Sequence, residues 1–261
     1  MTRVDGRWRA EGEDRLAVEE PLEIRLGGQS VSVVMRTPGD DDELAVGLLF
    51  TEGILSSPDE LADVRHSIDP RHPDLCNLID VTPKTPIDLA SRGWQRSFVS
   101  ASSCGLCGKQ TIASIHLHAP PIEDDLRVST DVLYALPDAL SETQPGFEET
   151  GGIHAAGLFE PDGTLLIVRE DIGRHNAVDK VVGAALFAGL YPLSGKVLLV
   201  SGRASFEIVQ KALVARIPFV AAVSAASSLA VELAETSSMG LVGFLRGRSA
   251  NVYAGAHRVL T

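Results

Sequence analysis

The feature that most constrains the fold is a regular alternation of short apolar runs with helical patterns in the C-terminal half of the chain. Each apolar run is five residues long, and Ser or Gly stands at most of the run ends. The expected strands are 196–200, 219–223 and 241–245, the expected helices are 176–190, 205–216 and 228–237, and a further strand pair is expected at 150–159 and 164–169. Buried strands that alternate with helices predict an α/β fold with a largely parallel sheet.

The N-terminal part predicts a smaller lobe built on a β-hairpin. Two strand-like runs, 21–26 and 31–35, flank a pair of glycines that suits a tight turn. Asp40 or Asp41 follows where an N-cap residue would begin a helix, and that helix is expected to end at Gly53.

The composition and net charge limit the size of the domain, the place where the protein can act and the partners that it can bind. With 261 residues, of which 44% are apolar, the chain can bury a sizeable core, so we expect one domain over 21–261 behind a loose polar segment over 1–20. The net charge of −12 argues against a nucleic acid partner, because duplex binding needs a basic face. No window of about 20 uninterrupted apolar residues is present, and the first residues lack the apolar run of a signal peptide. We expect a cytoplasmic protein that does not bind a membrane.

Two cysteines at Cys-x-x-Cys spacing, Cys104 and Cys107, mark the candidate centre of reactivity. Each is followed by glycine, and the pair lies between a strand-like run and a helix-like run. The positive end of the helix dipole and the nearby Lys109 favour the thiolate, which is the reactive form. In a reducing compartment such a pair is catalytic, redox-active or metal-binding. The third cysteine, Cys76, lies in an alternating apolar run and is expected to be a small core residue.

The cysteine pair by itself leaves three chemistries open. It could cycle between dithiol and disulfide, although no aromatic residue precedes Cys104. It could supply two zinc ligands with His154 as the third, but Ala156 then stands where zinc-dependent deaminases have a proton-shuttling glutamate, so a structural zinc is favoured over deamination. It could carry sulfur as a persulfide, which needs an activated thiolate in a glycine-lined loop.

Arginines follow three of the expected strands. They are Arg174, Arg203, Arg246 and Arg248. Ligands of α/β sheets collect beyond the carboxyl ends of the strands, and guanidinium groups bind phosphates in a bidentate fork, so these side chains could converge on a phosphorylated ligand. The sequence has no Gly-x-x-x-x-Gly-Lys-Ser/Thr motif and no Gly-x-Gly-x-x-Gly in a strand-to-helix turn, which leaves ATP hydrolysis and NAD chemistry unsupported.

Several sequence blocks occur in a defined order along the chain. They are Arg36-Thr-Pro-Gly-Asp40, Leu49-Phe-Thr-Glu-Gly53, Ser103-Cys-Gly-Leu-Cys-Gly108, Glu170-Asp-Ile-Gly-Arg-His-Asn-Ala-Val-Asp-Lys180, Ser201-Gly-Arg-Ala-Ser205 and Phe244-Leu-Arg-Gly-Arg-Ser-Ala-Asn-Val-Tyr253. Together they resemble the formate dehydrogenase accessory sulfurtransferase family, FdhD, and the resemblance runs from Glu20 to Leu260.

The resemblance implies a three-layer fold similar to that of cytidine deaminase, and a sulfurtransferase activity. Members of the family accept sulfur from a cysteine desulfurase as a cysteine persulfide. They deliver it to the molybdenum cofactor, Mo-bis(molybdopterin guanine dinucleotide), before this cofactor enters formate dehydrogenase. The cofactor is then a bound acceptor substrate, no permanent metal is expected, and a homodimer is the expected assembly.

The resemblance also implies residue roles. Cys104 is expected to hold the persulfide, with Cys107 as its partner in transfer. Contacts with the cofactor are expected from Phe244, Leu245, Arg246, Gly247, Arg248 and Ser249. Asp171, Arg174 and His175 could orient the cofactor or begin a capped helix, and the role of Arg203 stays open. The alternative function is a zinc-stabilised or redox-sensing chaperone that binds the cofactor without transferring sulfur; a pure adaptor for formate dehydrogenase would need neither cysteine.

Overall fold

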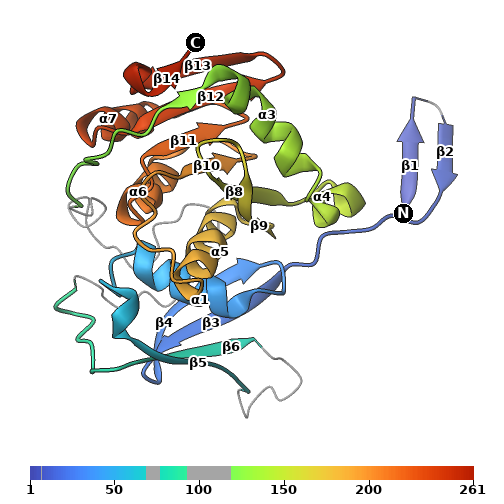
Figure 1. Cartoon of the computed structure of the whole chain (residues 1–261). Coiled ribbons are helices and arrows are strands. Elements are labelled where there is room, and N and C mark those ends of the chain that lie inside the picture. Colours follow the sequence, from blue (N-terminus) through green and yellow to red (C-terminus); the bar gives the residue numbers. More distant parts are fainter. Residues whose placement is uncertain (7, 69–76, 93–118) are drawn as a thin grey trace.

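The computed structural model describes residues 1–6, 8–68, 77–92 and 119–261, which form an α/β protein with a larger and a smaller sheet (Figure 1). The larger sheet consists of β8 (His154–Phe159), β9 (Leu165–Asp171), β10 (Val197–Val200), β11 (Phe219–Ala222), β12 (Gly240–Arg246) and β13 (Ser249–Ala254). The smaller sheet consists of β3 (Glu20–Leu26), β4 (Gln29–Arg36), β5 (Leu61–Ser67) and β6 (Leu78–Pro83). The helices are α1 (Asp41–Thr51), α3 (Thr130–Ser141), α4 (Pro145–Thr150), α5 (Arg174–Phe187), α6 (Phe206–Val214) and α7 (Ser228–Thr236).

The larger sheet is mixed, which corrects the expectation of a largely parallel sheet. Its strand order is β13-β12-β11-β10-β8-β9. The pairs β10–β11 and β11–β12 are parallel as expected, whereas β8 pairs antiparallel with both β10 and β9, and β13 pairs antiparallel with β12. The reason is that β8 and β9 are joined by a tight turn, and so are β12 and β13, so neither connection has the length that a parallel crossover requires. It follows that β9, β10, β11 and β12 all run in one direction.

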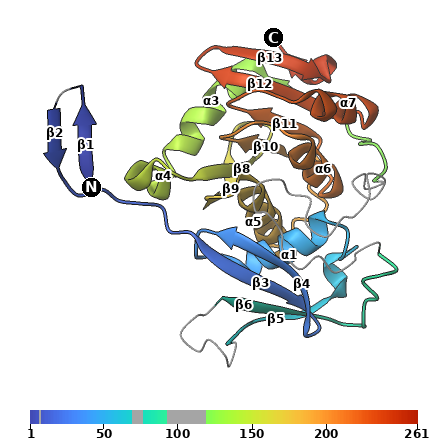
Figure 2. The ribbon, with the colours of Figure 1, turned by 180° about the vertical axis from the view of Figure 1, so that it is seen from behind.

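Helices cover both faces of this sheet. On one face, Leu133, Leu136 and Leu140 of α3 pack on strand residues that include Phe159 and Phe219, all at most 2% exposed. On the other face, α5, α6 and α7 cover the alternate strand residues. The helix α1 then lies against α5, and the smaller sheet packs beneath α1, so that the two sheets enclose the helical layer (Figures 1 and 2). Three layers are therefore present as expected, with the N-terminal lobe added on one side.

The helices α1 and α5 approach each other closely because each has a glycine at the crossing. A Cβ added at Gly47 would overlap the carbonyl oxygen of Asp179, and one added at Gly183 would overlap the carbonyl oxygen of Glu43. Only glycine lets two backbones come this near. This contact fixes the N-terminal lobe against the helical layer.

The N-terminal hairpin is confirmed as β3 and β4, which pair antiparallel about Gly27-Gly28. The helix that follows is also confirmed, and Asp40 stands at its N-cap position as expected, but the side-chain capping hydrogen bond is not formed. Asp40 occupies the N-cap position of α1 in a left-handed conformation and makes no side-chain cap hydrogen bond, while Asp41 is buried against Arg36. Arg36 therefore binds the carboxylate of Asp41, which the sequence pattern offered as a possible cap of the helix.

The other short elements are peripheral. The first residues form a hairpin of β1 (Thr2–Asp5) and β2 (Trp8–Glu11), and near the C-terminus β14 (Val259–Leu260) pairs with β7 (Val128–Ser129). The 3-10 turns are η1 (Pro58–Glu60) and η2 (Ala256–Arg258). The division of the chain at residue 20 stays a prediction. None of the described helices is long and apolar enough to cross a membrane.

Candidate functional site

The arginine-bearing segments meet at one edge of the larger sheet. Because β9, β10 and β12 run in the same direction, the residues that follow them lie at their shared carboxyl edge. The antiparallel β8 begins at this edge and brings His154 to it. The three segments therefore lie at one edge of the sheet, as expected, while the binding of phosphates by their arginines stays a prediction.

His154, Gly202 and Arg174 lie together at the centre of this edge. A Cβ added at Gly202 would lie 3.5 Å from Nδ1 of His154 and 3.8 Å from Cδ of Arg174, so glycine makes room for both side chains. Burial, and then the charge of Arg174, lower the pKa of His154 below its ordinary value. The imidazole is therefore neutral at pH 7. Within the described part of the chain, the Nε of Arg174 is buried and has no hydrogen-bond partner.

A groove of about 670 Å³ opens beside this cluster. His154 and Ser201 line one end of it, and residues of α3 and α4 line the other. The full lining is Pro137, Asp138, Leu140, Ser141, Gln144, Phe147, Gly151, Gly152, Ile153, His154, Ser201 and Val223. A groove with an apolar floor and a few polar groups is typical of small-molecule sites.

The remaining arginines differ in what they contact. Arg246 donates from Nε to the carbonyl oxygen of Val223, 3.1 Å away, which places it beside the groove. Arg248 turns towards α3 instead, where it pairs with Asp131 at 3.1 Å and lies over the ring of Tyr134. Arg203 is exposed at the edge. Thus Arg174, Arg203 and Arg246 are the arginines that the edge itself presents.

The predicted cofactor segment, Phe244–Ser249, forms the end of β12, a turn and the first residue of β13. The register shifts here, so that Phe244 and Leu245 together oppose Ala250 in a β-bulge. Phe244 has φ 51°, a left-handed conformation that is strained for an aromatic residue, and its side chain is 42% exposed. Leu245 is fully buried under α3, so any contact it makes with a ligand would come from its backbone. The bulge thereby directs Phe244 outwards.

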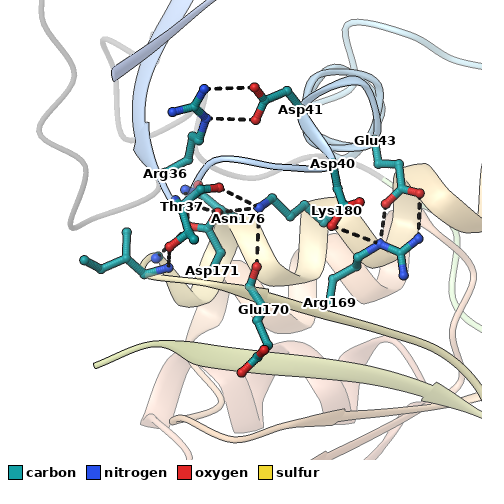
Figure 3. Close-up of polar contacts among 12 residues, drawn as sticks. Arg36, Thr37, Asp40, Asp41, Glu43, Arg169, Glu170, Asp171, Asn176 and Lys180 are labelled. Carbon is teal, nitrogen blue, oxygen red and sulfur yellow. Dashed lines mark hydrogen bonds and ion pairs between the residues drawn. The ribbon is translucent and has the colours of Figure 1, made fainter. Parts of the chain in front are cut away.

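Asp171 and Lys180 have a structural role (Figure 3). Both are almost completely buried, and Oδ2 of Asp171 lies 2.9 Å from Nζ of Lys180. Asp171 also accepts hydrogen bonds from the amides of Thr37 and Gly173 and from Nδ2 of Asn176. Lys180 in turn donates to the carbonyl oxygens of Thr37 and Glu170. This Asp171 cluster joins the end of the larger sheet to the segment that follows β4.

Two arginine pairs flank the Asp171 cluster on the same side of the molecule. Arg36 holds Asp41 through two hydrogen bonds of 2.8 and 2.9 Å, and Arg169 holds Glu43 in the same bidentate manner (Figure 3). Fork-to-fork pairs of this kind are geometrically specific. The block Arg36–Asp40 and the block Glu170–Lys180 are thus mutually bound, and much of the resemblance noted in the sequence belongs to this joint.

The cysteines Cys76, Cys104 and Cys107, and the helix expected at 110–117, lie outside the described residues. The described residues contain no group of three or more His, Cys, Asp or Glu side chains that could hold a metal ion. The assignments of Cys104 and Cys107, and of Phe244–Ser249 as cofactor contacts, stay predictions.

Comparison with known proteins identifies the family. The model of the FdhD/NarQ family matches residues 17–260. The chain belongs to the FdhD/NarQ family. The sulfur carrier protein FdhD of Streptomyces avermitilis is 50% identical over 253 residues, covering 94% of this chain and 89% of that protein. The protein of the same name from Saccharolobus solfataricus is 40% identical over 249 residues, covering 94% of this chain and 91% of that one.

A solved structure agrees with this FdhD/NarQ assignment at the level of the fold. The crystal structure of a candidate formate dehydrogenase accessory protein from Desulfotalea psychrophila superposes with a TM-score of 0.76, covering 100% of this chain and 97% of that one, at 23% sequence identity. The α/β architecture of the chain is therefore shared with this structure.

One buried cluster of this FdhD/NarQ chain was missed by the sequence interpretation. Nζ of Lys211, in α6, lies 2.9 Å from Oδ1 of Asp179, 3.1 Å from Oε1 of Glu52 and 2.9 Å from Oγ1 of Thr51. Burial opposes the charge of Lys211, but the nearby carboxylates of Asp179 and Glu52 raise the pKa of Lys211 above its ordinary value. For Asp179, the effect of burial is larger than the attraction of Lys211, and it raises the pKa of Asp179 to about 6. In the sequence, the lysine at position 211 among the apolar residues of 208–214 could have indicated this buried cluster.

His175 lies between this buried cluster and the edge. Its Nε2 is 3.3 Å from Oγ of Ser205 and 3.8 Å from Oε2 of Glu207. Burial, and then the charges of Lys211 and Arg174, lower the pKa of His175 to about 3. His175 is therefore a neutral, nearly enclosed side chain, whereas Arg174 faces the edge.

Proposed function

We propose that this chain is a sulfur carrier that accepts sulfur as a persulfide on Cys104 and passes it to the molybdenum cofactor that formate dehydrogenase requires. The observation that supports this best is the 50% identity, across nearly the whole chain, to proteins named sulfur carrier protein FdhD. The arginine-bearing edge beside a groove supports a phosphorylated acceptor.

Loading would be a thiolate exchange. The Cys104 thiolate attacks the outer sulfur of a persulfide on a cysteine desulfurase, the bond from that sulfur to the desulfurase cysteine breaks, and the desulfurase thiolate leaves. One S–S bond forms and one breaks, so no oxidant is needed. The glycines after both cysteines give the loop the freedom to meet a second protein.

Delivery would use the second cysteine. When the Cys107 thiolate attacks the sulfur atom of Cys104 itself, a Cys104–Cys107 disulfide forms and the outer sulfur leaves as sulfide, the form that a metal centre takes as a ligand. A cellular dithiol then reduces the disulfide. The spacing of two residues between the cysteines suits this step.

The acceptor, a molybdopterin guanine dinucleotide, is the substrate of this step and carries phosphates that need cationic partners. Arg174, which lies beside Gly202 and His154, and Arg246, beside Val223, are the best placed to bind them. His154 is neutral and can donate or accept a hydrogen bond, and the outward ring of Phe244 can stack on a base.

The first experiment follows the sulfur. Purified protein is incubated with a cysteine desulfurase and cysteine, and intact masses and zinc contents are measured for the wild type, Cys104→Ala and Cys107→Ala. We expect one sulfur atom to be gained by the wild type and by Cys107→Ala, to be removed by reductant, and to be absent from Cys104→Ala. If no sulfur is gained and one zinc ion per chain disappears with either cysteine, the cofactor-chaperone function replaces this proposal.

The same samples separate loading from delivery. Arg246→Gln should gain sulfur as the wild type does, but it should activate formate dehydrogenase at least tenfold less, because it lacks a phosphate contact. Arg65→Gln, at an exposed arginine of the smaller sheet, is the matched control. Equal activation by both variants would remove Arg246 from the cofactor site.

A further inference from the structure

The two ends of the groove differ in charge. At one end Arg246 lies beside Val223, and Arg174 lies beside His154. The other end is formed by α3 and α4, which lie on the β8 side of the larger sheet (Figures 1 and 2). Residues 128–152 contain no lysine or arginine but five acidic residues, namely Asp131, Asp138, Glu142, Glu148 and Glu149. Phosphates therefore suit the first end, and the α3–α4 end suits an uncharged part of the same ligand.

Gln144 presents an amide to the α3–α4 end. The residue is 8% exposed and lines the groove. It stands at the N-cap position of α4 but makes no side-chain cap hydrogen bond, and within the described residues its amide has no other partner. A largely buried amide that faces a groove is satisfied when a ligand supplies the matching groups. Gln144 thus indicates a ligand with a polar edge.

Asp138 and Phe147 line the same end of the groove. In the part of the chain that the structure describes, the carboxylate of Asp138 pairs with no cation. The ring of Phe147 is 49% exposed. Together with Gln144, these residues offer a flat apolar surface, a carboxylate that accepts hydrogen bonds and an amide that can donate one.

The strand β9 holds this end of the groove in place. Glu170 accepts hydrogen bonds of 2.8 Å from the amides of Gly146 and Phe147 in the first turn of α4. A Cβ added at Gly146 would lie 2.4 Å from Cδ1 of Ile153, so α4 packs closely on the segment that leads into β8. The groups that line the α3–α4 end are therefore fixed before a ligand arrives, which lowers the cost of binding.

An aminopyrimidinone ring matches this arrangement. One edge of the ring carries an amino group, a ring N–H and a carbonyl oxygen in a row, so the two donors can meet one carboxylate while the oxygen meets an amide donor. We propose that the α3–α4 end binds this edge of the acceptor. Asp138 accepts from the amino group and the ring N–H, Gln144 donates to the carbonyl oxygen, and Phe147 packs on the ring.

Two parts of the acceptor have this edge. In a molybdopterin guanine dinucleotide they are the guanine and the pterin, one on each side of the phosphates. With the phosphates at the arginine end, either ring can enter the α3–α4 end. The inference rests on the proposed function and names the residues that select its acceptor.

Calorimetric titration of the full-length chain with GDP and IDP tests the guanine, because IDP lacks only the amino group. We expect the wild type to bind GDP about tenfold more tightly than IDP, and Asp138→Asn to reduce this preference below about threefold, since the lost contact involves a charge. Gln144→Leu should weaken both nucleotides alike, because both carry the carbonyl oxygen. Glu142→Gln removes the same charge from the end of α3 but lies outside the groove lining, so as the matched control it should leave the preference unchanged.

Neopterin phosphate tests the pterin with the same variants. If the pterin enters the α3–α4 end, Asp138→Asn should weaken the binding of neopterin phosphate about tenfold and leave the preference for GDP unchanged.

Three results would overturn this assignment. The first is that Asp138→Asn changes neither the preference for GDP nor the binding of neopterin phosphate. The second is that Glu142→Gln has the same effect as Asp138→Asn, which would show a general effect of charge. The third is a wild type that binds neither kind of probe, which would contradict the acceptor of the proposed function as well. Persulfide loading needs neither Asp138 nor Gln144, so its measurement separates the two proposals.

Discussion

Neighbouring residues at the start of α5 differ in burial and therefore in what they can contact. Asp171 and His175 are buried, whereas Arg174 lies beside Gly202 at the edge of the sheet. Asp171 is fully buried and is held by a residue, Thr37, that lies 134 positions away in the chain. The same holds for Lys211, whose carboxylate partners come from two other helices or helix ends.

The buried state of His175 predicts a dependence of stability on pH. Its pKa is about 3 in the folded chain and about 6.5 in the unfolded chain, so between these values the unfolded chain binds a proton that the folded chain does not. The free energy of unfolding therefore falls as the pH is lowered through this range. Relative to His175→Gln, the wild type should lose about 2 kcal/mol between pH 7.5 and pH 5, as measured by urea unfolding. Parallel pH profiles for the two proteins would show that His175 titrates normally.

At the scale of elements, the crossing of α1 and α5 depends on its two glycines. Gly183→Ala places a methyl group against the carbonyl of Glu43, and the helices must separate to admit it. Overpacking of this kind typically costs about 1–3 kcal/mol, and we expect a loss near the upper end because both neighbours are backbone atoms. Gly12→Ala, where an added Cβ meets nothing within 4 Å, is the control and should change stability little. Thermal and denaturant unfolding measure both variants.

Most helices and strands of the larger sheet could be predicted from the sequence, since their apolar periodicity is local. The strand order could not, because the insertion of β8 between β10 and β9 is set by contacts between distant segments. Short elements such as α4, β5 and β13 were missed as well. For α4 a signal existed: Pro145 stands in its first turn, and Gly151 ends it with φ 63°. The bulge at Phe244 has no such local signal.

At the scale of the molecule, the Asp171 cluster makes the two sheets one cooperative unit. The amides of Thr37, after β4, and Gly173, after β9, both donate to the same carboxylate. We expect both amides to exchange hydrogen only through global unfolding, and hence with the same opening free energy. Lys180→Met leaves the Asp171 charge without its cation and should lower both values together by about 3–5 kcal/mol. If the amides of Thr37 and Gly173 in the wild type exchanged with different opening free energies, one lobe would open without the other.

The distance along the chain between the two halves of this cluster has a consequence for synthesis. The N-terminal lobe leaves the ribosome first, but the partners of Thr37 are made 134 or more residues later. Until then the segment after β4 lacks the carboxylate and the ammonium group that hold it, and Gly47 lacks the helix it packs on. The N-terminal lobe therefore cannot finish packing until the C-terminal half of the chain has been made. A chain that ends before residue 180 lacks Lys180 and cannot form the complete Asp171 cluster.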